Sequence, residues 1–213
     1  LTTGGMNVAI GQGALGGTTT GNYNVAVGRA ALSDNTTGDN NTAVGYAALN
    51  ANTASSNTAL GYSALSSNTT GAYNVAVGHV ALDANTTSSY LTAVGYDALG
   101  ANTDGAENVA VGSEALKANT TGSYNTGLGH QAGEKITTGS SNIVIGARAG
   151  DELTTAGQNT IIGQGAASNG STMDENVLIG VNAGYNGNSV HFNKNVAVGS
   201  EALKANTTGS YNT

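Results

Sequence analysis

The stretch NVAVGSEALKANTTGSY at residues 108–124 carries the pattern that the rest of the chain repeats. The spacing between successive copies is 17 residues, except for a 16-residue block at 41–56 and a 19-residue block at 176–194. Residues 195–213 repeat 108–126 letter for letter. Self-similarity at a fixed period predicts an array of stacked structural repeats. The blocks begin at Asn7, Asn24, Asn41, Asn57, Asn74, Leu91, Asn108, Asn125, Asn142, Asn159, Asn176 and Asn195.

Three positions of the 17-residue block barely vary along the chain. Position 5 is always Gly, which suits a backbone that turns through positive φ or packs too closely for a Cβ atom. Position 8 is always Ala, which indicates an interior site with room for one methyl group. Position 4 is always Val, Ile or Leu, and position 1 is nearly always Asn. We expect structural roles for Gly28, Gly45, Gly61, Gly78, Gly95, Gly112, Ala31, Ala48, Ala64, Ala81, Ala98, Ala115, Asn24, Asn41, Asn57, Asn74 and Asn108.

The block predicts β-structure, because Val, Ile and Thr dominate positions 2–4 and 17 residues leave no room for a stable helix plus turns. Two short strands per block are expected, with Asn-Thr-Thr-Gly at positions 12–15 forming a corner whose Gly permits the reversal. Alanine, valine and leucine are expected inside the coil, and stacked Asn side chains would form ladders between coils. The fold class is therefore all-β: a parallel β-solenoid with one 17-residue repeat per coil, about 58 Å long for twelve coils.

Both faces of the position 2–4 strand are apolar, since positions 2 and 4 point one way and position 3, usually Ala, points the other. The strand of a single solenoid needs only one apolar face, so the second face predicts association with other chains.

Two blocks also exchange an apolar residue between positions. Position 9 changes from Leu to Gly133 and Gly150 while position 12 changes from Asn to Ile136 and Leu153, as expected of one shared interior.

Composition excludes several classes of function. The chain has 33 glycines, no proline, cysteine or tryptophan, and only 9% charged residues, so neither disulfides nor thiolate metal sites are available. The net charge of −7 leaves no basic stripe for nucleic acid. No apolar run reaches the roughly 20 residues that span a bilayer, so no membrane insertion is expected in this segment. Residues 1–213 are interpreted as a single repeat array cut from a longer fibre.

The runs NVAVG and NTAVG, each followed by an Ala, resemble the head repeats of YadA-type trimeric autotransporter adhesins. Those repeats are usually shorter, so the Asn-Thr-Thr-Gly corner predicts a larger loop here. The form NTAVGYAAL at 41–49, together with IGARAGDELTT at 145–155, is similar to repeats of phage tail-fibre and surface proteins. The resemblance covers residues 7–213 and implies a homotrimeric, left-handed β-roll with an attachment or shaft role outside the cytoplasm, at a cell surface or in a virion fibre.

Few residues suggest chemistry. Residues 11–16, GQGALG, match a dinucleotide fingerprint, but no crossover helix follows. The histidines His79, His130 and His191 lie in blocks far apart, so no metal site is expected. The acidic pairs at 151–152 and 174–175 are expected on a solvated surface. General acid–base catalysis needs paired carboxylates in a cleft that shifts their pKa values, and a rod offers few clefts. We therefore expect neither catalysis nor a cofactor.

Two columns suggest binding instead. Position 17 carries Tyr23, Tyr73, Tyr90, Tyr124 and Tyr211, which could stack against sugars. Position 13–14 Thr pairs could order water and bind ice, although adjacent residues of a strand point to opposite faces. The leading hypothesis is a non-enzymatic structural or adhesive extracellular fibre, with itself as partner and a host-surface glycan or protein as possible receptor. The alternatives are a self-assembling filament and a binding module for ice or glycan.

Overall fold

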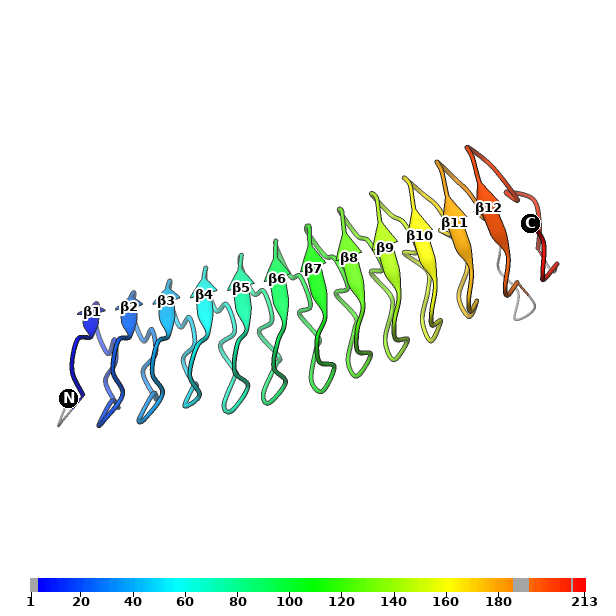
Figure 1. Ribbon diagram of the computed structural model, residues 1–213. Coiled ribbons are helices and arrows are strands. Elements are labelled where there is room, and N and C mark those ends of the chain that lie inside the picture. Colours follow the sequence, from blue (N-terminus) through cyan, green and yellow to red (C-terminus); the bar gives the residue numbers. More distant parts are fainter. Residues whose placement is uncertain (1–3, 186–191, 208) are drawn as a thin grey trace.

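The computed structural model describes residues 4–185, 192–207 and 209–213, and it forms a rod of stacked coils (Figure 1). The strands lie side by side along the rod, and the two ends of the chain lie at its opposite ends. All strands belong to one parallel sheet in sequence order. They are β1 Val8–Ile10, β2 Val25–Val27, β3 Thr42–Val44, β4 Thr58–Leu60, β5 Val75–Val77, β6 Thr92–Val94, β7 Val109–Val111, β8 Thr126–Leu128, β9 Ile143–Ile145, β10 Thr160–Ile162, β11 Val177–Ile179 and β12 Val196–Val198.

Each sequence block forms one coil. Val75, Ala76 and Val77 of β5 pair with Thr92, Ala93 and Val94 of β6, a shift of one block. The two blocks of unusual length keep this pairing, because Thr42 pairs with Thr58 and Val177 pairs with Val196. The length differences are therefore accommodated outside the strands, and the prediction of a parallel β-solenoid with one repeat per coil is confirmed.

The prediction of two strands per block is wrong, since each coil has one three-residue strand in the described part of the chain. Backbone hydrogen bonds between coils do continue beyond it, for example from Leu65 N to Ala81 O at 2.9 Å. However, positions 7 and 9 adopt left-handed backbone angles, with φ of 59° at Ala30 and 50° at Leu32. Extended strands require negative φ, so this side of the coil is a series of turns.

The Asn-Thr-Thr-Gly corner also differs from expectation. The position 15 glycines, such as Gly38 and Gly71, do not have positive φ. The left-handed residue of the corner is instead position 17, which is Tyr73 with φ 59° in one coil and Glu107 with φ 58° in another. At Gly71 a side chain lacks space, because a Cβ atom there would collide with the Ser88 carbonyl oxygen of the next coil, although the same position is Ser88, Ala156 or Met173 in other coils.

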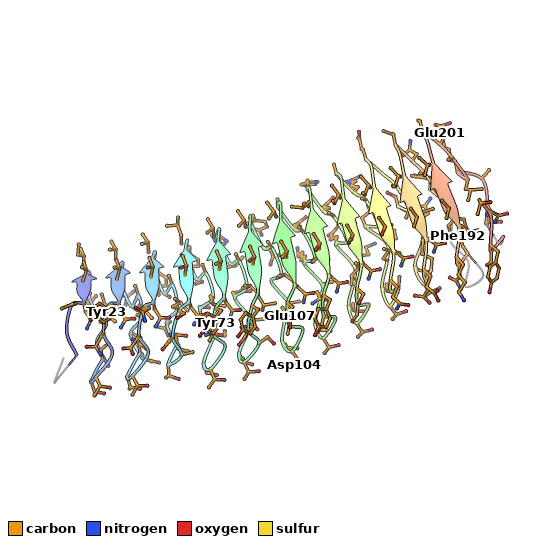
Figure 2. All side chains as sticks on the ribbon, viewed as in Figure 1. Tyr23, Tyr73, Asp104, Glu107, Phe192 and Glu201 are labelled. Atoms are coloured by element: carbon orange, nitrogen blue, oxygen red, sulfur yellow. The ribbon has the colours of Figure 1, made fainter. Side chains whose placement is uncertain are left out.

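The interior is built from small side chains. Position 3 and position 8 alanines, such as Ala76 and Ala81, are fully buried, and so are the position 9 leucines such as Leu82. Toward the C-terminal end larger residues help to fill the interior: Leu153 and Met173 are fully buried, and so is Phe192, which Figure 2 labels. A Cβ atom on Gly150 would lie 2.7 Å from Leu153 Cδ1. The predicted exchange between positions 9 and 12 thus occurs inside the rod.

A column of buried position 1 asparagines holds the coils together. Asn74 Oδ1 accepts a hydrogen bond from Leu91 N at 2.9 Å in the next coil, and Asn74 Nδ2 donates to Ser88 O at 2.8 Å across its own coil. Position 12 forms a second column, in which Asn68 Nδ2 donates to Asn52 Oδ1 at 2.7 Å. This second column stops at Asn119, whose Oδ1 is buried without a partner because the next coil has Ile136 there.

Replacing one position 1 asparagine should destabilise the rod measurably. In Asn74→Ala the Leu91 N–H loses its acceptor within the protein interior, so we expect the free energy of unfolding to fall by about 2–3 kcal/mol. Denaturant unfolding followed by circular dichroism measures this change. Thr87→Ala alters an exposed residue of the same coil and should change the free energy by less than about 0.5 kcal/mol. Equal effects of the two substitutions would contradict a structural role for the column.

Candidate interaction surfaces

Position 4 gives the outer face of the sheet an apolar row along the whole rod, to which position 2 adds Val or Ile in most strands and Thr in β3, β4, β6, β8 and β10. Position 3 points inward, so positions 2 and 4 point outward, and every position 4 residue is Val, Ile or Leu. These side chains are partly or largely exposed within the rod: Leu60 is 48% exposed, Val75 36% and Ile143 43%. No charged residue lies within any of the described strands. The valines of positions 2 and 4, expected inside the coil, thus form an outer surface, which we call the apolar stripe.

An aromatic column runs beside the apolar stripe at position 6. Tyr46 stacks on Tyr62 with ring centroids 5.1 Å apart, and Tyr62 stacks on His79 at 5.0 Å. Tyr96 continues the column 5.6 Å from His79, and the Arg29 guanidinium lies 5.6 Å from the Tyr46 ring centre. Each inner ring covers the face of its neighbours, so the column stabilises the stack and offers mainly ring edges to solvent.

The position 17 tyrosines are exposed but do not form a continuous platform. Tyr73 and Tyr90 stack at 5.2 Å, and Lys194 Nζ lies 5.6 Å from the Tyr211 ring centre. Figure 2 labels Tyr23, Tyr73 and Glu107 along this column. Because non-aromatic residues separate Tyr23 and Tyr124 from the other tyrosines, the structure brings together only the pair Tyr73–Tyr90 among the described residues.

The threonine column at position 13 is tied into the rod by its hydroxyl groups. Thr69 Oγ1 donates to Thr86 O at 2.9 Å, and Thr120 Oγ1 donates to Thr137 O at 3.1 Å. At position 14 the second column is interrupted by Asp104, which is labelled at the corner in Figure 2. Where a position 13 hydroxyl proton is used in this way, it is not free to order an ice-like water layer. Thr208, in the last of the pairs, lies outside the described residues.

The other sequence motifs have structural positions. Gly11 of the GQGALG motif is the position 5 glycine of its coil, with φ 126°, and the described part of the chain has no helix to follow it. His79 lies in the aromatic column, and His130 lines a surface pocket considered below. His191 lies outside the described residues. Among the residues that the structure describes, no three His, Cys, Asp or Glu side chains converge on one point.

Lys117, Lys135, Lys194 and Lys204 form ion pairs along the rod surface. Lys117 Nζ lies 3.0 Å from both Asp97 Oδ2 and Glu114 Oε1, and these two hydrogen-bonding carboxylates raise the pKa of Lys117. Glu114 also accepts a hydrogen bond from Gln131 Nε2 at 2.8 Å, and this bond is the main cause that lowers its pKa. Such partly exposed pairs contribute little to stability each, so they mainly fix the surface side chains from coil to coil.

Comparisons with known proteins add no family to this picture. No family model, no curated protein and no solved structure matches the chain. Within the described residues there is also no helix long and apolar enough to cross a membrane. What is established is a β-solenoid repeat protein with an apolar stripe on its outer face.

Proposed function

We propose that this chain is a non-enzymatic structural fibre, the shaft or head of a trimeric attachment protein that acts outside the cell or virion body. The apolar stripe is the observation that carries the proposal. Soluble monomers rarely expose a continuous apolar surface of this extent, so a partner covers it. The resemblance to YadA-type head repeats would make the coil left-handed and the assembly a homotrimer, with a cell-surface or virion-fibre location.

The repeat of the apolar stripe argues for a second copy of the chain as the partner. The stripe presents one position 2 and one position 4 side chain per coil, at the spacing of neighbouring strands, through β1 to β12. A partner that covers it throughout needs apolar groups at the same spacing over the same length. A parallel copy meets both conditions. Three copies would bring three stripes onto a common axis, where the inward position 3 face and the outward face are both buried.

Charge within the apolar stripe should therefore break the assembly. In the double variant Val94→Asp and Val111→Asp, two half-buried outward valines of β6 and β7 become carboxylates that association would desolvate. We expect the wild-type chain, at 20.8 kDa, to give a light-scattering mass of three chains and the variant to give a monomer. Circular dichroism shows whether the variant keeps its β-structure.

Thr121→Asp is the matched control, since it adds the same charged side chain at position 14, where the preceding coil already has Asp104. This control should keep the trimer mass. A wild-type chain that stays monomeric at high concentration would overturn the trimer. A mass that keeps growing with concentration would replace it with the self-assembling filament.

A further inference from the structure

The rod has a polar pocket where the repeat departs from its consensus, on the coils that contain β8 to β11. Its volume is about 570 Å³, which lies in the range of small-molecule sites. The residues 130, 147–148, 151–152, 164–165, 168–169, 182 and 185 line it. They come from positions 6–7 and 10–11 of successive coils, so the pocket lies on the turn side of the rod and not on the apolar stripe. Asp151 and Glu152, expected on a solvated surface, line this pocket.

Two small residues shape the pocket. Position 6 holds Tyr in three coils of the aromatic column, but here it is Ala147. Position 7 of the following coil is Gly165, where a Cβ atom would lie 2.6 Å from the Asn182 side-chain oxygen. Ala147 thus leaves a gap in the position 6 column, whereas the space beside Gly165 is taken by the Asn182 amide, which lines the wall of the pocket.

The pocket lining combines hydrogen-bond donors and acceptors, and it carries both positively and negatively charged side chains. Arg148 is held in place because its Nε donates to Gln131 Oε1 at 3.1 Å, and Ser168 Oγ donates to Arg148 O at 2.6 Å. Glu152 accepts a hydrogen bond from Lys135 at 2.6 Å. Together with the amides of Gln164 and Asn182, these groups offer directional contacts to a ligand that both donates and accepts hydrogen bonds.

Asp151 supplies an unsatisfied acceptor. Its carboxylate lines the pocket, and Oδ1 is buried without a hydrogen-bond partner. Burial raises the pKa of Asp151, and a side-chain hydrogen bond with Ser168 partly opposes that rise, so only Oδ1 lacks a partner. An unsatisfied carboxylate oxygen in a protein costs free energy, which a donor on a bound ligand would recover once the carboxylate rotates toward it.

We propose that this pocket binds a carbohydrate, as one or two neutral sugar residues. Sugar hydroxyls both donate to carboxylates such as Asp151 and accept from Arg148 and amide groups, while the Tyr185 ring and the Ala147 methyl can contact the apolar face of a sugar ring. A free anion would meet two carboxylates, and a bare metal ion would lack three converging ligands among the described residues. The site is separate from the apolar stripe, so this proposal does not depend on the trimer.

Filling the hollow tests the proposal with little risk to the fold. Ala147→Tyr places at position 6 the side chain that Tyr46, Tyr62 and Tyr96 place there in other coils. Gln12→Tyr places the same side chain at position 6 of the coil of β1, far from the pocket, and is the matched control. Circular dichroism should show the wild-type spectrum for both variants.

Binding is measured first on an array of neutral oligosaccharides and then by titration of glucose, galactose, mannose and N-acetylglucosamine to millimolar concentration, followed by NMR. We expect saturable binding of at least one of these sugars. Ala147→Tyr should weaken it by at least about tenfold, and Gln12→Tyr should leave it unchanged. Asp151→Asn, which keeps the shape but removes the charge, should also weaken binding.

Two outcomes would overturn the carbohydrate site. One is the absence of saturable binding to any of these sugars, in which case the fibre keeps its structural role without this pocket. The other is binding that Ala147→Tyr leaves intact, which would move the site elsewhere. Loss of binding through Tyr73→Ala, which is far from the pocket, would favour the tyrosine pair at position 17 instead.

Discussion

Gly78→Ala should abolish the stacking of the coils around β5 and β6, with a loss of about 4 kcal/mol or more of the free energy of unfolding. Gly78 has φ 142°, a backbone angle that residues with a side chain rarely adopt. A Cβ atom there would lie 2.7 Å from the Gly95 carbonyl carbon of the next coil and closer still to its oxygen. Because both atoms belong to backbone that pairs with its neighbours, the collision cannot be relieved by a side-chain rotation.

The consequence for a rod differs from that for a globular domain. Each coil contacts only the coils before and after it. Loss of the contact between two neighbouring coils therefore divides the array into two shorter stacks. Hydrogen exchange should therefore show lost protection centred on the coils of β5 and β6, and thermal unfolding should become broader or biphasic. An unchanged melting curve for Gly78→Ala would contradict the close approach of Gly78 to the Gly95 backbone.

Two controls separate the causes of the loss. Gly199→Ala has nearly the same φ, 132°, but nothing lies within 4 Å of the added atom, so it should cost only the backbone strain of about 1–3 kcal/mol. Gly157→Ala, at a position where other coils have Ser or Ala, should cost less than about 0.5 kcal/mol. If Gly199→Ala destabilised its coil as much as Gly78→Ala does, strain alone would explain both.

The exchange between Gly133 and Ile136 should show strong energetic coupling. Ile136 is fully buried, so Ile136→Asn alone leaves a cavity that should cost about 2–4 kcal/mol. In Gly133→Leu the first added atom would lie 2.9 Å from both Ile136 Cδ1 and Leu116 Cδ2, so overpacking should cost about 2–3 kcal/mol. Each substitution alone therefore disturbs the interior of the coil of β8.

The double variant Gly133→Leu and Ile136→Asn should recover most of this loss. The leucine introduced at residue 133 would fill the space that Ile136 leaves, and the remaining close contact with Leu116 Cδ2 involves the end of a flexible side chain that can turn away. The amide introduced at residue 136 could donate to Asn119 Oδ1, as Asn119 Nδ2 donates to Asn102 Oδ1 at 2.9 Å. The unpaired acceptor then moves from Asn119 to residue 136, so the double variant should lie within about 1 kcal/mol of the wild type, with a coupling energy of at least about 3 kcal/mol. Denaturant unfolding of the wild type, the two single variants and the double variant gives the four free energies of this double-mutant cycle. If the losses of the two single variants simply added in the double variant, residues 133 and 136 would not share one interior space.

The solenoid could be predicted because each position of the block is sampled many times in one chain. The buried Ala76 and Ala81 lie where constant or nearly constant alanines indicated an interior, and Gly78 lies where a constant glycine indicated a close approach. The exchange of Leu for Gly at residue 133 was readable for the same reason, since the lost side chain reappears at residue 136. Internal repetition thus supplied information that a single globular sequence does not contain.

The candidate surfaces were less predictable. Two apolar faces of the strand could be recognised, but only the coordinates show that Ala76 faces inward while Val75 and Val77 face outward. The polar pocket had no signal in the sequence, because Arg148, Asp151 and Asn182 come from different coils or different turns and meet only after stacking. Ala147 and Gly165 are ordinary residues of a glycine-rich and alanine-rich chain until their larger neighbours are placed around them.

The sequence by itself determined the period, the coil, the residues that must be small and the polar columns that join one coil to the next. The tertiary structure alone decided that each coil has one strand followed by turns, because leucines such as Leu82 take φ 55° against their own preference. No local rule places Leu in this conformation. Stacking of the coils enforces it. The Leu82 N–H donates to Ala98 O at 3.1 Å in the next coil, and the Leu82 side chain is fully buried. The same hydrogen bond and burial recur at the equivalent leucines of other coils.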